Sequence, residues 1–323
     1  MSFDFLLSSF ILIISFIILI KAADYLVSSG SILGQRAGIS KFVIGLTIIA
    51  IGTSLPELIT GIMSIFTSQN NAPAFVLGTV IGSNIANTLL VFGILLFLAK
   101  KYKIEKNNRD VYFLIFSTCL IGLGIFLGFF SMILGILFLL LFLIYMYIAV
   151  KFGNKDDFEE ELEEVKDNKL EKLKNGTLVS IFLLASIGLS ISAKGIILSI
   201  EAIGPMLGIS IQFLTLTTVA FATSLPEIIV TISAIKRNEL SLGIGNIIGS
   251  NISNILLIVG SSAIFGIIFN NQIKFNPNDF MLSFIILFIV TLFFALLIQK
   301  KELKRIHGII LLLTYFLYII LIL

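Results

Sequence analysis

The feature that most constrains this chain is a repeat within its own sequence. Residues 45–65 read GLTIIAIGTSLPELITGIMSI and residues 215–235 read TLTTVAFATSLPEIIVTISAI, with eleven of 21 positions identical at an offset of 170. A second pair follows in the same order: residues 78–93 read GTVIGSNIANTLLVFG and residues 245–260 read GNIIGSNISNILLIVG, with ten of 16 identical at an offset of 167. Composition alone can produce scattered leucine and isoleucine matches, but it does not produce two ordered copies of T-S-L-P-E and G-S-N-I-x-N. The chain is therefore predicted to fold as two related halves.

The repeats lie in a chain that is too apolar to be soluble in water. Of its 323 residues, 58% are hydrophobic and only 13% are charged, against about 25% charged in an average soluble domain. A globule of this size cannot bury that much apolar surface. The composition excludes a soluble enzyme, a nucleic-acid-binding protein and a disordered protein, and it predicts a multi-pass membrane protein.

Apolar runs of about 20 residues, the length that crosses a bilayer, predict ten transmembrane helices. They cover residues 4–26, 42–66, 72–98, 110–129, 131–150, 177–203, 211–235, 242–268, 279–299 and 306–323. Alternate connections hold 19 lysines and arginines, whereas the other connections hold only Lys274. Positive residues stay cytoplasmic, so both termini are expected to face outward, and the strict alternation supports the count of ten.

The only long hydrophilic stretch divides the chain at its middle. It predicts a first five-helix repeat over residues 1–150, a cytoplasmic acidic linker over 151–176 and a second five-helix repeat over 177–323. We expect a solvated linker, with a regulatory ion sensor as the alternative. Because five is odd, the second half enters the membrane in the opposite orientation. The predicted fold is therefore all-α, with inverted-topology repeats, an arrangement in which transporters bind substrate near the midplane on interrupted helices.

The first repeated motif concentrates oxygen atoms at a helix break. On a helix, Thr53 and Ser54 precede Glu57 by four and three residues, so their oxygens share one face. Pro56 cannot donate a hydrogen bond to the carbonyl of Gly52, which predicts a kink at this point. The second half offers the same set, namely Thr223, Ser224, Pro226 and Glu227.

The second repeated motif adds further oxygen ligands. Ser83 precedes Asn87 by four residues, as Ser250 precedes Asn254. Carboxylates, hydroxyls, amide oxygens and free carbonyls suit a hard cation, and Ca²⁺ takes about 6–8 such ligands. Two glutamates carry a charge of −2, which one Ca²⁺ or two Na⁺ neutralise. The motifs therefore predict a cation site without a resident cofactor.

Several polar residues have no assigned role at this stage. Asn84 and Asn251 match between the halves, but an asparagine in a membrane helix is often interhelical packing, so both interpretations stay open. Asp24, Lys194 and Glu201 do not match between the halves, and we expect snorkelling or local ion pairs there. The single cysteine and the single histidine, Cys119 and His307, lie outside both motifs.

G-T-S-L-P-E followed by G-S-N-I-x-N, present twice, resembles the alpha-repeats of the cation/calcium exchanger superfamily, specifically its prokaryotic sodium/calcium exchangers. The resemblance covers nearly the whole chain. It implies exchange of about three Na⁺ for one Ca²⁺ by alternating access, with one net charge moved. It also implies a set of ligands. For Ca²⁺ these are the Glu57 and Glu227 carboxylates and the Thr53 and Thr223 carbonyls; for Na⁺ they are Ser54, Ser224, Ser83, Ser250 and the Ala50 and Ala220 carbonyls, with Asn87 and Asn254 completing the ring.

The chain departs from the family pattern at two positions. Ala222 stands where the first half has Gly52 and the family has glycine. Asn254 stands where the potassium-dependent branch carries aspartate; because the neutral amide adds no charge for K⁺, we predict K⁺-independent exchange.

The main alternative is an H⁺/Ca²⁺ antiporter. Members of that branch resemble a different glutamate-centred motif and commonly include a membrane histidine, whereas the only histidine here, His307, lies away from both repeats, which favours Na⁺. A cation channel is a second alternative, although one chain supplies both halves of this site. An intramembrane hydrolase would need a histidine base or two spanning aspartates, so we expect no enzyme activity. The expected partners are Ca²⁺, Na⁺ and the bilayer of a prokaryotic plasma membrane, with no nucleic acid, and we expect a monomer.

Overall fold

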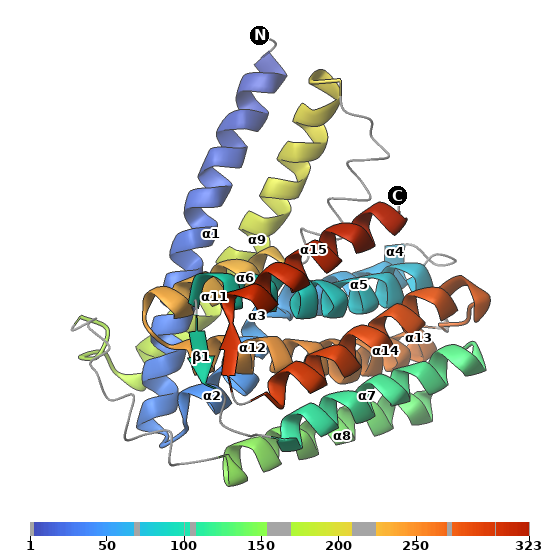
Figure 1. Ribbon diagram of the computed structural model, residues 1–323. Coiled ribbons are helices and arrows are strands. Elements are labelled where there is room, and N and C mark those ends of the chain that lie inside the picture. Colours follow the sequence, from blue (N-terminus) through green and yellow to red (C-terminus); the bar gives the residue numbers. More distant parts are fainter. Residues whose placement is uncertain are drawn as a thin grey trace. The chain divides into compact units, whose positions relative to one another are not determined.

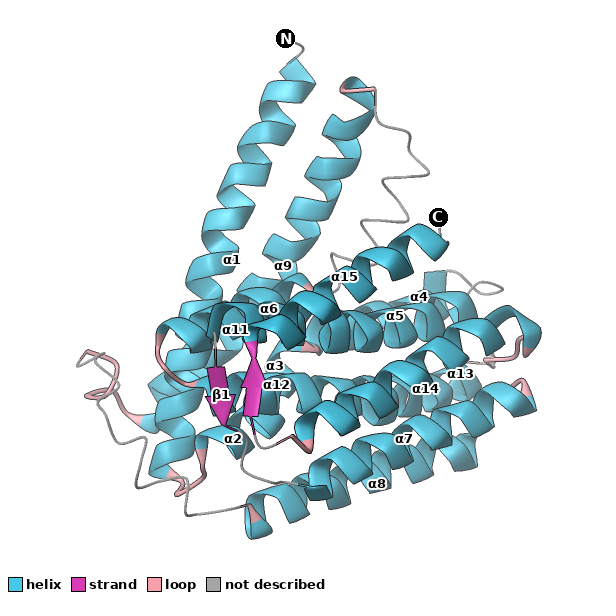
Figure 2. Cartoon of the chain, in the orientation of Figure 1, coloured by secondary structure: helices cyan, strands magenta, loops and turns pink. Residues whose placement is uncertain are grey.

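The described residues are almost entirely helical (Figure 2). The computed structural model describes residues 3–67, 72–99, 101–103, 108–153, 169–208, 224–269, 273–300 and 302–322. The first half contains α1 (Phe3–Arg36), α2 (Lys41–Ile44), η1 (Gly45–Ile49), α3 (Ala50–Thr53), α4 (Leu55–Thr67), α5 (Ala72–Ala86), η3 (Asn87–Val91), α6 (Phe92–Ala99), β1 (Lys101–Lys103), α7 (Asn108–Leu127) and α8 (Met132–Phe152). The second contains α9 (Asn175–Met206), α11 (Leu225–Lys236), α12 (Leu240–Ser253), η5 (Asn254–Ile258), α13 (Val259–Ile268), α14 (Asn278–Ile298), β2 (Glu302–Lys304) and α15 (Arg305–Ile322). The segments labelled η are π-helical.

Most predicted spans agree with the structure. In the described part of the chain, eight helices are long and apolar enough to cross a membrane: Asp4–Arg36, Lys41–Phe66, Ala72–Ala99, Arg109–Leu127, Met132–Phe152, Asn175–Met206, Leu240–Ile268 and Asn278–Ile298. A shorter apolar helix covers Arg305–Leu321, where we predicted the last span. The predicted span over 211–235 lies largely outside the described residues, and its described end forms α11.

The first helix is longer than predicted, because α1 continues to Arg36 rather than ending near residue 26. Ser28 and Ser29 are accommodated in this helix, because their hydroxyls donate to the carbonyls four residues earlier, both at 2.6 Å. Two residues after the end of α1, Gly38 adopts a positive φ of 70°, which suits glycine, and the Ile39 amide donates to the Gly34 carbonyl at 2.9 Å.

The chain forms two compact units, and each draws on both halves of the sequence. The first unit comprises Met1–Thr53, Asn154–Asn246 and Phe316–Leu323, and the second comprises Ser54–Gly153 and Ile247–Tyr315. These units are therefore a different division from the two sequence repeats, and the division into repeats stays a prediction.

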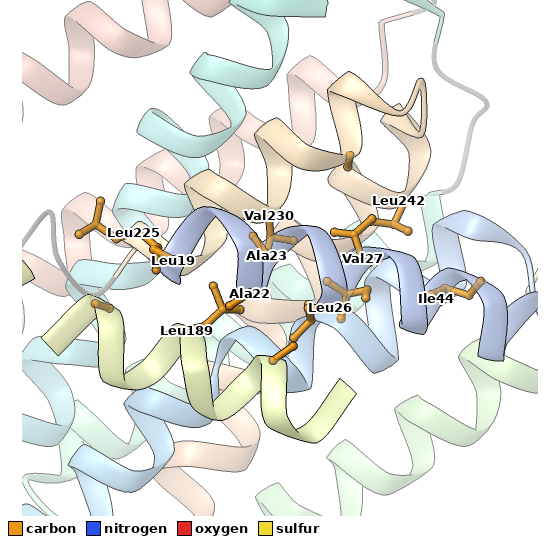
Figure 3. Close-up of a cluster of buried hydrophobic side chains, with 14 of the residues drawn as sticks. Leu19, Ala22, Ala23, Leu26, Val27, Ile44, Leu189, Leu225, Val230 and Leu242 are labelled. Carbon is orange, nitrogen blue, oxygen red and sulfur yellow. The ribbon is translucent and has the colours of Figure 1, made fainter. Parts of the chain in front are cut away.

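The first unit is built on the pair α1 and α9, which lie side by side (Figure 1). Residues Leu19, Ala22, Ala23 and Leu26 of α1 pack with Leu189 of α9, as Figure 3 shows. The helix α11 joins the same cluster through Leu225, Val230 and Ala234. Burial of these aliphatic side chains fixes α11, which carries one repeated motif, against α1.

A second contact in the first unit depends on two glycines. A Cβ atom at Gly45 would lie 2.0 Å from the Leu242 carbonyl oxygen, and one at Gly245 would lie 2.1 Å from the Phe42 carbonyl oxygen. The start of α12 therefore crosses α2 and η1 with backbone against backbone. Only glycine permits such an approach, as is common where membrane helices pack closely.

The second unit pairs helices from opposite halves of the sequence. The helix α7 packs against α14, and α8 packs against α13. The short strands β1 and β2 form an antiparallel pair in which Tyr102 faces Leu303, a small departure from the predicted all-α fold. The helices α4 and α5 contact each other, and both contact η5, so three segments that carry repeated motifs pack together.

Candidate functional site

Both copies of T-S-L-P-E lie at the start of a helix. In the first copy α3 ends at Thr53, Ser54 forms a bend, and α4 begins at Leu55, so the predicted break is present. In the second copy Ser224 precedes α11, which begins at Leu225. In both copies the proline is the second helical residue, where its missing amide proton costs no internal hydrogen bond.

Glu57 and Glu227 occupy the first turns of α4 and α11. Their exposed fractions are 2% and 1%, although carboxylates are among the side chains least often buried. The predicted shared face of Thr53, Ser54 and Glu57 assumed one continuous helix. Because the helix is interrupted at Ser54, spacing alone does not place these side chains, and their shared face stays a prediction.

The second motif is accompanied by a feature that we did not predict. The segments η3 and η5 begin at Asn87 and Asn254, which are matched positions in the two copies, and each interrupts a longer α-helix for five residues. Segments of π-helix are rare and are found frequently at functional sites, because they alter the direction of side chains and backbone groups.

The second unit gathers buried polar atoms around α4, α5 and η5. Among the described residues, the Ser54 and Ser83 hydroxyls and both polar atoms of the Asn87 amide are buried without a hydrogen-bond partner, as is Oδ1 of Asn254. Buried polar atoms are nearly always paired in native proteins, so a group of exceptions needs an explanation. Oxygens of this kind are the ligands that hard cations prefer.

Asn84 and Asn251 are the matched asparagines whose role, functional or packing, the sequence did not decide. Both take part in hydrogen bonds within the second unit. Asn84 Nδ2 donates to the Asn251 carbonyl at 3.0 Å, and Asn254 Nδ2 donates to Asn84 Oδ1 at 2.9 Å. Asn251 Nδ2 donates to the Thr88 hydroxyl at 3.1 Å. Both asparagines therefore connect α5 and η3 to α12 and η5.

The first unit contains other described motif residues. The Thr53 hydroxyl lies 3.2 Å from the Ala50 carbonyl and 3.3 Å from Asn246 Oδ1. The Ser224 hydroxyl is buried and has no hydrogen-bond partner in the described part of this unit. The helix α11, which carries Glu227, contacts α3, which carries Thr53.

Asn246 is a buried polar residue that the sequence analysis missed. Matching identical residues between the halves passes over it, because its counterpart is Thr79. The signal was nevertheless present, since Asn246, Ser250 and Asn254 follow at intervals of four and so extend one polar face of a helix.

Comparison with known proteins identifies the family. The family model for sodium/calcium exchanger proteins matches residues 7–151 and, separately, residues 177–323. The chain belongs to the sodium/calcium exchanger family.

Relatives of this exchanger cover nearly its whole length. Sodium/calcium exchanger MaX1 from Methanosarcina acetivorans is 32% identical over 96% of this chain and 97% of its own length. Inner membrane protein YrbG from Escherichia coli is 28% identical over 96% of this chain and 94% of its own length. A solved structure of the sodium-calcium exchanger NCX_Mj, soaked with Na⁺ and Ca²⁺, superposes with a TM-score of 0.78 at 28% identity and covers 97% of both chains. The chain is accordingly a multi-pass membrane protein of a transporter family.

Two of the predicted ligands of this exchanger, Thr223 and Ala220, lie outside the described residues. Ala50 is buried at the start of α3, and its carbonyl accepts from the Thr53 hydroxyl. Ser83 and Ser250 are buried four residues before the two π segments.

Two charged residues of this exchanger outside the motifs have contacts within the first unit. Asp24 accepts a hydrogen bond from the Ser233 hydroxyl of α11, and the snorkelling or local ion pair expected there stays a prediction. Buried Glu239, which the sequence analysis did not single out, accepts from the Ser31 hydroxyl at 3.1 Å and lies 3.8 Å from the Lys41 ammonium. These contacts connect α1 and α2 to the segment between α11 and α12.

His307 has contacts away from the motifs. Its Nδ1 accepts from the Lys304 amide at 2.9 Å, and its Nε2 lies 3.3 Å from the Lys300 ammonium. The structure therefore accounts for this histidine by contacts at the start of α15.

Proposed function

We propose that this protein is an electrogenic Na⁺/Ca²⁺ antiporter that exchanges about three Na⁺ for one Ca²⁺ by alternating access and does not require K⁺. One observation carries the proposal. Glu57 and Glu227 occupy matched positions in a membrane chain, both are almost fully buried, and each lies three residues after a serine whose buried hydroxyl has no partner among the described residues. A buried carboxylate in a span is costly, and such residues mark ion pathways.

The proposed ligands come from both copies of both motifs. The glutamate carboxylates bind Ca²⁺ together with the carbonyls of Thr53 and Thr223. Na⁺ is bound by the hydroxyls of Ser54, Ser224, Ser83 and Ser250 and by the carbonyls of Ala50 and Ala220, and Asn87 and Asn254 complete the set. The net charge of −2 is neutralised by one Ca²⁺ or two Na⁺. A third Na⁺ makes the exchange electrogenic.

We propose K⁺ independence because position 254 is a neutral asparagine. A stretch of 70 residues is 36% identical to human sodium/potassium/calcium exchanger 2, over 22% of this chain and 10% of that protein. Dependence on K⁺ therefore needs a direct test: Na⁺-driven Ca²⁺ flux should be the same in media with and without K⁺.

Ten helices in two inverted repeats, with outward termini, provide the architecture for alternating access. The contacts between connections support this proposal. The strands β1 and β2 join the third-to-fourth and ninth-to-tenth connections, which we assign to the cytoplasm. Phe129 bridges to Lys274 between two connections that we assign to the outside. Arg36 donates to the Leu173 carbonyl, and Lys41 lies near Glu239, again between connections of the same assigned side.

Ca²⁺ uptake into proteoliposomes tests the proposed transport. We expect uptake driven by an imposed Na⁺ gradient and accelerated by a membrane potential of the appropriate sign. Uptake driven by a pH gradient alone would indicate an H⁺/Ca²⁺ antiporter instead. Uncoupled flux that only follows the Ca²⁺ gradient would indicate a channel.

The two glutamates are tested by charge-neutral substitutions. Glu57→Gln and Glu227→Gln should each abolish Na⁺-driven Ca²⁺ uptake, because each removes half of the negative charge that compensates Ca²⁺. Glu201→Gln is a matched control, since Glu201 is exposed and has no counterpart in the other half. Full flux in both motif variants would contradict the assigned site.

A further inference from the structure

Three asparagines of the second unit form a chain of hydrogen bonds. Asn254 Nδ2 donates to Asn84 Oδ1, and Asn84 Nδ2 donates to the Asn251 carbonyl. Asn84 and Asn251 are 1% and 2% exposed, and Asn254 is fully buried. Hydrogen bonds in such surroundings are strengthened by the low local dielectric, so breaking one is costly.

The donors and acceptors in this row of hydrogen bonds determine which way each side-chain amide is turned. A backbone carbonyl can only accept, so Asn84 must direct its Nδ2 group to Asn251. The other polar atom of Asn84 is then Oδ1, which can only accept as well. Asn254 must therefore direct its Nδ2 group to Asn84, and its own Oδ1 points away from this bond.

The direction of the Asn254 amide matters for a cation. Its Oδ1 atom has no hydrogen-bond partner among the described residues. If the Asn254 side-chain amide were flipped, so that Oδ1 and Nδ2 exchanged places, it would offer an NH₂ group, which repels a cation, in place of an oxygen. An aspartate offers an oxygen in either orientation, so only an asparagine at this position needs to be held one way.

We propose that Asn84 is a positioning residue, which fixes the amide of Asn254 so that its oxygen rather than its nitrogen is presented to the transported cation. This inference rests on the proposed function, in which Asn254 is a ligand. Asn84 itself does not contact the ion. It acts through one hydrogen bond of 2.9 Å and is held in turn by one of 3.0 Å.

In the part of the chain that the structure describes, the matched asparagine of the other copy, Asn87, lacks such a hydrogen bond. The counterpart bond would join Asn87 Nδ2 to Asn251 Oδ1, and both atoms are without a partner in the described residues. The sequence provides a reason: Asn251 Nδ2 is bound to the hydroxyl of Thr88, whose counterpart is Ile255, a residue that cannot accept a hydrogen bond. The two proposed asparagine ligands are therefore not equivalent, and among the described residues only Asn254 is held in one orientation by such a bond.

A double-mutant cycle on the purified full-length protein tests the proposal, with equilibrium binding of Ca²⁺ in Na⁺-free buffer as the measurement. Asn84→Ala should weaken Ca²⁺ binding by about tenfold in the parent protein, the range expected for a buried hydrogen bond that controls a ligand. In the Asn254→Ala background the same substitution should change the dissociation constant less than about twofold, because no amide remains to be oriented. Equal losses in both backgrounds would mean that Asn84 acts by packing alone and would overturn the proposal.

Thr88→Val is the control, because it breaks the neighbouring bond to Asn251 without touching Asn254. It should leave the Ca²⁺ dissociation constant within about twofold of the parent value; a loss as large as that of Asn84→Ala would contradict the specific role of Asn84. If Asn84→Ala is not recovered as folded protein, Asn84→Ser serves in its place, since the serine side chain is too short to reach Asn254.

The outcomes also separate this inference from the proposed function. If Asn254→Ala leaves Ca²⁺ binding unchanged while Glu57→Gln abolishes it, Asn254 is not a ligand and the inference fails, but the carboxylate site stands. If Glu57→Gln also leaves Ca²⁺ binding unchanged, the proposed site itself is wrong.

Discussion

The two copies of G-S-N-I-x-N share a local backbone and differ in what surrounds it. Both lead into a five-residue π segment that begins at an asparagine, Asn87 in η3 and Asn254 in η5. The Asn254 amide is hydrogen-bonded to Asn84, whereas the Asn87 amide has no partner among the described residues. Similar local sequence thus accompanies the same five-residue π segment, while neighbouring residues decide how each side chain is held.

The largest expected difference lies at the glycines that begin the two copies. A Cβ atom at Gly245 would lie 2.1 Å from the Phe42 carbonyl oxygen, whereas one at Gly78 would meet nothing within 4 Å. Gly245→Ala should therefore lower the free energy of unfolding by about 3 kcal/mol or more, because backbone cannot move aside as a side chain can. Gly78→Ala should change it by about 1 kcal/mol or less. Thermal unfolding in detergent measures both, and similar midpoints for the two variants would contradict the comparison.

The second-largest expected difference is between the stabilities of the Asn254→Ala and Asn87→Ala variants. Asn254→Ala leaves Asn84 Oδ1 buried without its donor, so it should destabilise the ion-free protein by about 2 kcal/mol more than Asn87→Ala. Both variants remove the same volume at matched positions, so the difference reports the hydrogen bond. The measurement is thermal unfolding in the presence of chelator; equal losses would show that the two amides are held alike.

Substitution of Thr88 should give a smaller loss of stability. Thr88→Val removes the acceptor of Asn251 Nδ2 and should cost about 1–2 kcal/mol of stability, since a buried donor is left without a partner. Thr88→Ser keeps the hydroxyl and is the matched control. Thermal unfolding should rank the serine variant nearer to the parent protein than the valine variant, and the reverse order would argue against this bond.

The smallest expected stability change concerns the serines, where the two halves should respond alike. The Ser54 and Ser224 hydroxyls are buried without a partner in the described residues, so Ser54→Ala and Ser224→Ala should each leave stability unchanged or raise it by about 1 kcal/mol. Each should nevertheless weaken the Na⁺ dependence of Ca²⁺ flux by several-fold, because a proposed Na⁺ ligand is lost. Ser64→Ala is the control, since its hydroxyl is already bonded to the Gly61 carbonyl at 2.7 Å. A response in only one half would show that the two serines have different roles.

The sequence predicted the long helices and the motif residues because both depend on local patterns. Apolar runs determine a membrane span, and a proline that lacks an amide donor interrupts a helix, as Pro56 does next to the break at Ser54. The predicted first span ended near residue 26, whereas α1 continues to Arg36. The Ser28 and Ser29 hydroxyls bond to carbonyls within the helix, so these polar residues do not end it.

The features that sequence did not predict depend on contacts between distant segments. The pairing of β1 with β2 joins residues about two hundred positions apart, and no pattern in Lys101–Lys103 specifies Glu302–Lys304 as its partner. The π segments and the orientation of Asn254 depend in the same way on packing and on Asn84. The sequence identified Asn84 as a matched residue but could not say which neighbour it bonds.

The pairing of helices across the two halves also has a consequence for the order of synthesis. The neighbour of α1 is α9, that of α7 is α14 and that of α8 is α13, and in each pair one member belongs to the second half. While the ribosome makes the first half, these three helices cannot reach their native neighbours. They must remain inserted in the lipid until the later helices follow, so a truncated message would yield a chain that can enter the membrane but cannot complete either compact unit.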